Sequence, residues 1–217
     1  MTTMRWVAAV GAAVLLAGSA AGAEPAKGVA LFDGKTLQGW KEVDFGGHGP
    51  IKIKEGGILE IGMGASLTGL VYTNEPVRMN YEITLEGRRT MGSDFFCGLT
   101  FPVGTNSCSL ILGGWGGGVT GVSSIDSYDA SENSTTGFTE FKADRWYAIR
   151  LRVTARKIEA WLDDKQIVDA DTEGKRLGMR PGEIEMCVPL GLATWETTGE
   201  LKNLRVRKLE ASEVPHE

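Results

Sequence analysis

The chain has few of the residues that hold metals or phosphates. Its 217 residues include two histidines and three cysteines. No CxxC, HExxH or Cys/His cluster occurs, so a zinc site is not expected. The run GGWGGG at 113–118 lacks the Gly-Lys-Ser/Thr that completes a phosphate-binding loop, and no dinucleotide fingerprint is present. The sequence therefore requires no cofactor.

A surplus of positive charge is also missing. The chain has 23 lysines and arginines against 28 acidic residues, and its formal net charge is −5. Nucleic-acid phosphates and anionic membrane surfaces attract basic proteins, so neither is an expected partner. The apolar run from Trp6 to Ala17 is shorter than the roughly 20 residues of a membrane-spanning helix, so no membrane span is expected.

Residues 1–23 have the three parts of an export signal in the right order. Arg5 supplies the positive start, the apolar run follows, and Ala21-Gly22-Ala23 fits a small-residue cleavage site. We expect cleavage near Ala23 and a periplasmic or extracellular location. The alternative is a frayed N-terminal helix of a cytosolic protein.

Long amphipathic helices are absent from the rest of the sequence, where alternation with a period of two dominates. Apolar and polar residues alternate in VRMNYEITLEGRR (77–89) and again in 145–171, where DDK marks a turn, and ELKNLRVRKL (200–209) closes the chain as a strand. With 30 glycines, this pattern predicts an all-β antiparallel β-sandwich of the jelly-roll type. We assign residues 24–210 to one domain and 211–217 to a polar tail.

The three cysteines leave two alternatives open. Export permits disulfides, and Cys97 and Cys108 lie on two strand-like runs joined by PVGTNS, where they are candidate neighbours across a hairpin. The other interpretation treats Cys97, Cys108 and Cys187 as small buried hydrophobic residues.

Residues 112–137 resist assignment to a strand. This stretch is rich in Gly, Ser and Thr, and long loops in compact domains are usually functional or disordered. Asp126, Asp129 and Glu132 recur every three residues and, with Asn133, are candidates to bind a sugar or a calcium ion. The alternative is that these residues form turns and caps, as Asp does in many Ser/Asn-rich segments.

Three stretches carry a resemblance to a known family. LFDGKTLQGWK (31–41) resembles the opening of the 3-keto-disaccharide hydrolase domain family, whose fold is of the concanavalin A-like lectin/glucanase type. KIEAWLDDKQIVD (157–169) is similar to a hairpin of the family, and GLATWETTGELKNLRVRKL (191–209) to its closing strands. The resemblance covers residues 31–209.

The resemblance implies action on glycosides whose C3 hydroxyl has been oxidised to a ketone. The ketone acidifies the C2 proton, a base removes it, and the C1 oxygen leaves by elimination, after which water adds. Such a site needs a base, an acid and a group that stabilises the enolate. It also needs a separate sugar oxidoreductase to make its substrate. Family members carry Gln and His where this chain has Ala193 and Trp195, which makes it a divergent member.

We predict Asp126 as the catalytic base, with Asp94 and Arg88 as auxiliary groups. His48 is a further acid–base candidate, because His titrates near neutral pH. Each has a structural alternative as a turn, strand-end or loop residue. A metal is left open, with calcium or manganese as the candidates.

Aromatic residues supply the predicted substrate platform. Trp115 and Trp195 are candidates to stack on sugar rings, with core packing as the alternative for each. We assign Trp40, Trp146 and Trp161 to packing. Asp129, Glu132 and Asn133 complete the predicted substrate-binding set.

The sequence lacks the E-x-D-x-E carboxylate row of retaining sandwich glucanases, so ordinary glycoside hydrolysis is not expected. The predicted function is an exported enzyme acting on 3-keto-glycosides. A non-catalytic glycan-binding module is the alternative, and a structural envelope domain is a third hypothesis.

Overall fold

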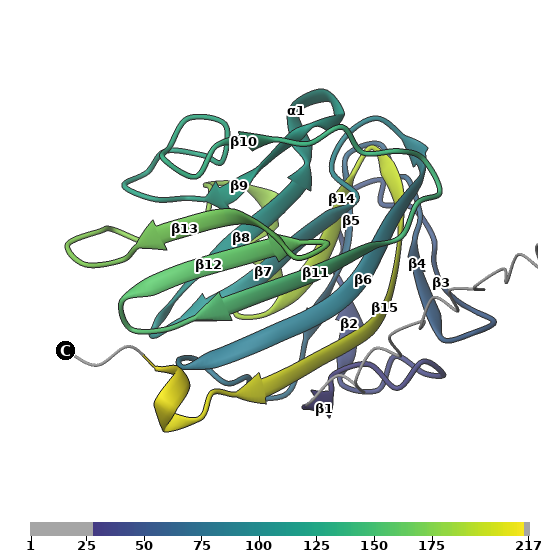
Figure 1. Cartoon of the computed structure of the whole chain (residues 1–217). Helices are drawn as coiled ribbons and strands as arrows, with labels where there is room; N and C mark the ends of the chain where they lie inside the picture. Colours follow the sequence, from purple (N-terminus) through teal and green to yellow (C-terminus); the bar gives the residue numbers. More distant parts are fainter. Residues whose placement is uncertain (1–27, 215–217) are drawn as a thin grey trace, which may run out of the picture.

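Two antiparallel sheets stack face to face in the computed structural model, which describes residues 28–214 (Figure 1). This arrangement confirms the predicted antiparallel β-sandwich. The expected export signal at 1–23 and His216 lie outside the described residues. Within residues 28–214 no helix is long and apolar enough to cross a membrane.

The first sheet, here sheet A, has the strand order β13-β12-β11-β6-β15-β4-β3, and β1 pairs with β15 at one end. Its strands are β1 (Val29–Ala30), β3 (Ile51–Lys54), β4 (Ile58–Ile61), β6 (Tyr81–Gly92), β11 (Tyr147–Val153), β12 (Lys157–Leu162), β13 (Lys165–Asp171) and β15 (Thr197–Lys208).

The second sheet, here sheet B, has the order β10-β9-β8-β7-β14-β5-β2. Its strands are β2 (Trp40–Glu42), β5 (Leu67–Tyr72), β7 (Cys97–Val103), β8 (Asn106–Gly113), β9 (Val119–Ser123), β10 (Gly137–Phe138) and β14 (Gly191–Trp195). Three short turns complete the fold, namely α1 (Gly114–Gly117), η1 (Glu183–Cys187) and η2 (Ala211–Glu213).

The main core lies between the two sheets and follows the alternation read from the sequence. On β6 the side chains of Tyr81, Ile83 and Leu85 are buried, and on β11 those of Tyr147 and Ile149 are buried as well. Full burial of a large apolar side chain is worth about 1.5–3 kcal/mol, so this stripe fixes which face of each strand turns inward. A shift of one residue in register would expose the whole stripe.

The opening segment LFDGKTLQGW packs a tight turn onto the edge of the sandwich. Asp33 Oδ1 accepts hydrogen bonds from the backbone N–H groups of Lys35 (2.8 Å) and Thr36 (2.7 Å). Leu31 and Trp40 are buried, and the Trp40 indole N–H donates to the Leu31 carbonyl at 2.7 Å. The assignment of Trp40 to packing is therefore confirmed.

The cysteines follow the second alternative, since Cys97, Cys108 and Cys187 are all free and buried. Cys97 lies opposite Leu112 and Cys108 opposite Phe101 in the β7–β8 pair, so the hairpin does not bring the two sulfurs into register. Burial raises the pKa of each of the three thiols to about 12, which keeps them protonated near neutral pH.

The segment 112–137 is more regular than its composition suggests. It contains β9, which pairs with β8, and the two-residue β10, which pairs with β9. Backbone pairing to a neighbouring strand overrides the weak β propensity of its glycines. The expected long loop is thus reduced to the α1 turn and the connection between β9 and β10.

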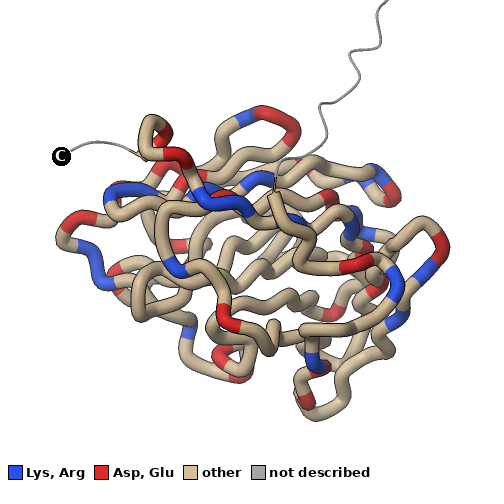
Figure 2. The backbone as a smooth tube through the Cα atoms, turned by 90° about the horizontal axis from the view of Figure 1, so that it is seen from below, with Lys and Arg blue, Asp and Glu red and all other residues tan. Residues whose placement is uncertain are grey.

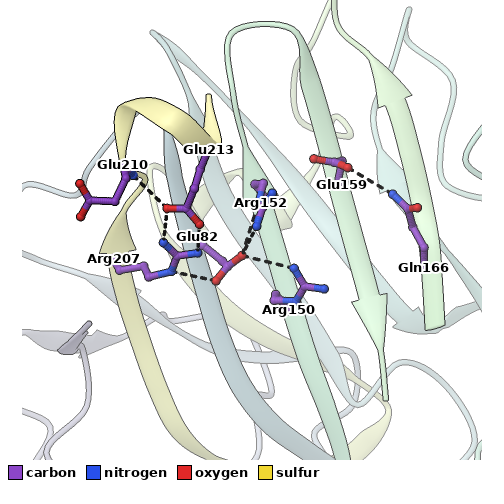
Figure 3. Close-up of polar contacts among 8 residues, drawn as sticks. All are labelled: Glu82, Arg150, Arg152, Glu159, Gln166, Arg207, Glu210 and Glu213. Carbon is purple, nitrogen blue, oxygen red and sulfur yellow. Dashed lines mark hydrogen bonds and ion pairs between the residues drawn. The ribbon is translucent and has the colours of Figure 1, made fainter. Parts of the chain in front are cut away.

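Charged side chains cover the outer face of sheet A. In Figure 2 basic and acidic residues are interspersed along the chain. The carboxylate of Glu82 is only 7% exposed and lies within 3.4 Å of Arg150, 3.1 Å of Arg152 and 3.0 Å of Arg207 (Figure 3). Glu200 forms a similar group with Lys54 and Arg88.

Two tryptophans lie on this charged face and are half-buried. The Arg88 guanidinium lies 4.6 Å from the Trp146 ring centre, and that of Arg150 lies 3.7 Å from the Trp161 ring centre. Trp146 and Trp161 therefore pack against arginines on the outer surface and are not part of the core between the sheets.

The polar tail begins with the ordered turn η2. The Glu213 carboxylate accepts hydrogen bonds from both terminal nitrogens of Arg207 at 2.7 and 2.8 Å. These bonds and one from the backbone N–H of Glu210 lower the pKa of Glu213 to about 2. The start of the tail is thereby fastened to β15.

Removing the Glu82 carboxylate is expected to destabilise the fold, because three guanidinium groups would then face one another without a counter-ion. Breaking a buried ion pair from one side costs about 3–5 kcal/mol, and because the arginines are partly exposed we expect about 3 kcal/mol for Glu82→Ala in a urea titration. The matched control is Glu159→Ala on β12, whose carboxylate bonds Gln166 at 3.3 Å. Equal losses for the two variants would contradict a special role of Glu82.

Candidate functional site

A cleft of about 450 Å³ opens on the outer face of sheet B. Its floor comes from β5, β8, β9, the end of β14 and the residues just before β7. The α1 turn forms one side, and the segment that leads into η1 forms another. The lining residues are Leu67, Asp94, Phe95, Ser109, Ile111, Trp115, Ser123, Arg180, Pro181, Gly182, Glu183, Ile184 and Trp195.

The pleat of sheet B places the core on its inner face and the cleft on its outer face. On β8 the side chains of Cys108, Leu110 and Leu112 belong to the core between the sheets. Their neighbours Ser109 and Ile111 point to the other face and line the cleft. A second apolar cluster supports this outer face, formed by Val43, Phe45, Leu67, Phe95, Ile111, Ala130, Ile184, Cys187 and Ala193.

The glycine run 113–118 forms the tight turn that presents Trp115. Trp115 has φ 50° and ψ 54°, in the left-handed region that costs a residue with a Cβ about 1–2 kcal/mol. Asp94 offsets this cost, because its Oδ2 accepts a hydrogen bond from the Gly116 N–H at 2.8 Å. Arg89 donates to the carbonyls of Asp94 and Gly117 at 3.3 and 3.2 Å and ties the turn to the strand end.

Residues 172–190, here called the strap, connect β13 to β14 and form another side of the cleft. The strap is paired with the residues after β9. The N–H of Ser124 donates to the Gly178 carbonyl at 2.7 Å, and that of Asp126 donates to the Arg176 carbonyl at 2.7 Å. The Asp126 carboxylate adds bonds from the Arg176 N–H (2.9 Å) and the Lys175 ammonium (3.0 Å).

Arg180 is the one cation among the residues of 28–214 that line the cleft. Its Nε lies 3.4 Å from Asp129 Oδ2, and its guanidinium lies 5.7 Å from the centre of the Trp115 ring. The ion pair and the aromatic contact together orient the guanidinium at the cleft, where its other N–H groups remain available to a ligand.

Three of the predicted site residues meet in this cleft. Trp115 is 42% exposed and Trp195 is 37% exposed, so neither takes the core-packing alternative. Asp94 lines the cleft beside them, with its two oxygens bonded to the backbone N–H groups of Phe95 and Gly116. In this position Asp94 holds the Trp115 turn.

Asp126 lies outside the lining of the cleft. The N–H of Arg176, followed by the ammonium of Lys175, lowers the pKa of its carboxyl below the usual value. A carboxylate that is stabilised in its charged form accepts a proton less readily. The structure thus gives Asp126 a place in fastening the strap, which does not fit the predicted role of catalytic base.

Arg88 and His48 also lie away from the cleft. Arg88 is on the outer face of sheet A, where its Nη2 is 2.6 Å from Glu200, because neighbouring residues of a strand point to opposite faces and Arg89 takes the other side. His48 is an exposed loop residue with Nδ1 3.0 Å from the Gly49 carbonyl and Nε2 4.0 Å from Asp44. Neither residue fits its predicted catalytic role.

The predicted substrate-binding residues of 129–133 are committed to other contacts. Asp129 pairs with Arg180 and so acts on the cleft indirectly. The Asn133 amide donates to the carbonyls of Val122, Tyr128 and Asp129 at 2.7–2.9 Å. These bonds commit the amide to holding the loop together. Glu132 is exposed and lies outside the cleft lining. The alternative of turn formers and caps describes these residues better.

Sequence reasoning missed Arg180 and Glu183. Glu183 begins η1 and is exposed in the cleft. A usable signal was present, because residues 172–190 contain no strand pattern and carry Pro181-Gly182 between charged residues. Long irregular connections of this kind are commonly functional.

The acidic residues do not converge. Within the described part of the chain no group of three or more His, Cys, Asp or Glu side chains is placed to hold a metal ion. Asp126 is paired with Lys175, and Asp129 with Arg180.

The fold and the cleft define a lectin-like β-sandwich with its candidate ligand site on the outer face of one sheet. The chain belongs to the 3-keto-alpha-glucoside-1,2-lyase-like domain family, which it matches over residues 27–207. The resemblance found in the sequence is thus confirmed. A search of curated proteins found no match.

Solved structures share the fold at low sequence identity. The carbohydrate-binding module CBM66 from Bacillus subtilis has a TM-score of 0.51 and 13% identity, with 78% of this chain and 96% of that chain covered. A carbohydrate esterase from the Shiga toxin-encoding bacteriophage phi24B has a TM-score of 0.55 and 11% identity, with coverage of 85% and 100%. The Emp46p carbohydrate recognition domain in its metal-free form has a TM-score of 0.53 and 12% identity, with coverage of 81% and 91%.

Asp94→Ala is expected to loosen the Trp115 turn, because the Gly116 N–H loses its charged acceptor. Hydrogen bonds to charged groups are worth about 1.5–3 kcal/mol, so amide exchange at Gly116 should rise at least about tenfold. Exchange at Leu110, in the core of β8, should be unchanged. Protection of Gly116 that survives in Asp94→Ala would show that Arg89 and the glycines hold the turn without Asp94.

Proposed function

We propose that this protein is a carbohydrate-active protein and that the cleft on sheet B binds its sugar. The observation that carries the proposal is the placement of two exposed tryptophans, Trp115 and Trp195, in one cleft together with Arg180 and Glu183. Family membership and the shared fold of carbohydrate-binding proteins support it. A structural domain without a ligand would have no use for two tryptophans exposed in one hollow.

The chemistry of the cleft suits a sugar ring. A pyranose has an apolar face of C–H groups that packs on a flat aromatic ring, and hydroxyls that need donors and acceptors at the edge. The indole rings offer the flat surface. Arg180 supplies donors and the Glu183 carboxylate supplies acceptors on the strap beside it.

The family suggests a finer function, elimination from a 3-keto-glycoside. In this scheme the Glu183 carboxylate removes the C2 proton and its electron pair forms the enolate of the C3 ketone. The Arg180 guanidinium stabilises that enolate. Collapse of the enolate breaks the C1–O bond, and the aglycone oxygen takes a proton from water. The hydroxide that remains adds to C1 of the unsaturated sugar, and the protonated Glu183 returns its proton to C2, which restores the carboxylate.

Glu183 replaces Asp126 as the proposed base for a geometric reason. It lines the cleft, and its carboxylate accepts no hydrogen bond from other described residues, whereas Asp94 in the same cleft is bonded to two backbone N–H groups. A separate sugar oxidoreductase remains part of this proposal, because the substrate must be oxidised at C3 first. Export through residues 1–23 would place the reaction in the periplasm or outside the cell.

A non-catalytic glycan-binding module is the second candidate. It is favoured by Ala193 and Trp195, which stand where family members carry Gln and His. Ala193 is fully buried in the apolar cluster under the cleft, and Trp195 adds an aromatic platform instead of an acid–base group.

Turnover separates the two candidates. With 3-keto-glucosides and their unoxidised parents, tested with and without calcium or manganese, we expect aglycone release from the keto forms alone. Glu183→Gln should lower kcat by about 10²–10⁴, the usual contribution of a general base. Glu132→Gln, an exposed acid outside the cleft, should leave kcat unchanged. A loss confined to Asp126→Asn would return the base to Asp126, and glycan binding without any turnover would favour the binding module.

Trp195→Ala is expected to weaken glycan binding by about tenfold, since loss of an aromatic contact costs about 0.5–1.5 kcal/mol beyond its buried area. Isothermal titration calorimetry measures the change. Trp146→Ala, on the outer face of sheet A, is the matched control and should bind as the unchanged protein does. Equal weakening in the two variants would argue against the cleft as the sugar site.

A further inference from the structure

The polar groups on the floor of the cleft are already bonded within the protein. The Ser109 hydroxyl lies 2.9 Å from that of Thr100 and 3.7 Å from the Met179 sulfur. The Ser123 hydroxyl accepts a hydrogen bond from the Ala130 N–H at 2.9 Å. A hydroxyl has one donor and two acceptor positions. Beyond these contacts Ser109 keeps one acceptor position, and Ser123 keeps its donor and one acceptor. The floor can therefore pair with one or two ligand groups, but not with the several hydroxyls of a pyranose.

The rest of the floor is apolar. Leu67, Phe95, Ile111 and Ile184 line it, and they belong to one cluster with Ala193. Trp115 and Trp195 flank this surface with exposed rings. A flat apolar group fits against such a floor without losing hydrogen bonds.

The uncommitted charged groups of the cleft lie together on the strap. Arg180 has free guanidinium N–H groups beyond its contact with Asp129, and Glu183 follows three residues later. The cleft therefore has a polar side that matches one sugar ring and a floor that does not match a second one. A sugar hydroxyl buried on that floor without a partner would cost about 1–3 kcal/mol, and a second pyranose would bring several.

We propose that the cleft selects glycosides with an aromatic aglycone, the aromatic ring lying on the floor beside Trp115 and Trp195 and the sugar facing Arg180 and Glu183. This inference rests on the proposed function and names its substrate class. It sets aryl glycosides apart from disaccharides, in which a second sugar would have to occupy the floor.

The carboxylates of the cleft agree with this substrate class. Elimination from an ordinary sugar–sugar bond needs an acid to protonate the leaving oxygen as well as a base. Among the described acids that line the cleft, Glu183 alone is uncommitted, because Asp94 is bonded to two backbone N–H groups. A phenol is far more acidic than a sugar hydroxyl, with a pKa of about 10 as in tyrosine, so an aryl oxygen leaves as phenolate and takes its proton from water.

Binding to the full chain tests the inference. Calorimetry with phenyl glucosides, methyl glucosides, maltose and cellobiose, with both anomers of each glucoside, compares the occupants of the floor directly. We expect a phenyl glucoside to bind at least about tenfold more tightly than the methyl glucoside of the same anomer and than either disaccharide. Trp115→Ala should reduce the preference for phenyl over methyl to about twofold, and Trp146→Ala should leave it intact.

The possible failures are distinguishable. If a disaccharide binds as tightly as the phenyl glucoside, the proposed preference for aryl glycosides is wrong. The proposal that the cleft binds carbohydrate then still holds. If free phenol binds as tightly as its glucoside, the sugar contributes nothing to binding. That result overturns the proposal that the cleft selects glycosides and indicates a pocket for apolar groups. No binding of any sugar overturns the proposed function and this inference with it. The ratio of kcat/KM for phenyl and disaccharide 3-keto-glucosides gives the same comparison for turnover.

Discussion

The pleat of sheet B is the constraint on which the rest of the site depends. Because successive side chains of a strand point to opposite faces, one short run of β8 supplies Leu110 and Leu112 to the core and Ser109 and Ile111 to the cleft. The core fixes the register of the strand, and the register fixes which side chains line the cleft. The cleft floor is therefore positioned by the same strand pairing that builds the core.

Most charged residues near the cleft hold its walls in place. Asp126 fastens the strap, Asp129 orients Arg180, and Asp94 holds the Trp115 turn. Asp126 and Asp129 look like catalytic candidates in the sequence because they lie close together in one polar segment. Each is bonded to backbone N–H groups or to a cation in the structure, so these acids hold other groups of the cleft walls in place.

Family membership and the geometry of the cleft bear on different questions. The family gives the fold and the kind of chemistry to test, whereas the residues that carry a reaction have to be found in the cleft of this chain. In this chain Ala193 is buried in the apolar cluster under the cleft, and Trp195 lines the cleft with an exposed ring. The uncommitted charged groups of the cleft lie on the strap, at Arg180 and Glu183.

The sequence by itself determined the sandwich, because the period-two alternation at Tyr81, Ile83 and Leu85 admits only one buried face. It also indicated the family, and it identified Trp115, Trp195 and Asp94 as site candidates from their chemistry beside glycines and strand ends. Only the tertiary structure decided that Arg88 points away from the cleft, that Asp126 is a fastening group and that Arg180 and Glu183 enter the site. The physical reason is that local pattern specifies which face of a strand is buried, whereas a loop such as the strap is placed by contacts with residues far away in the chain.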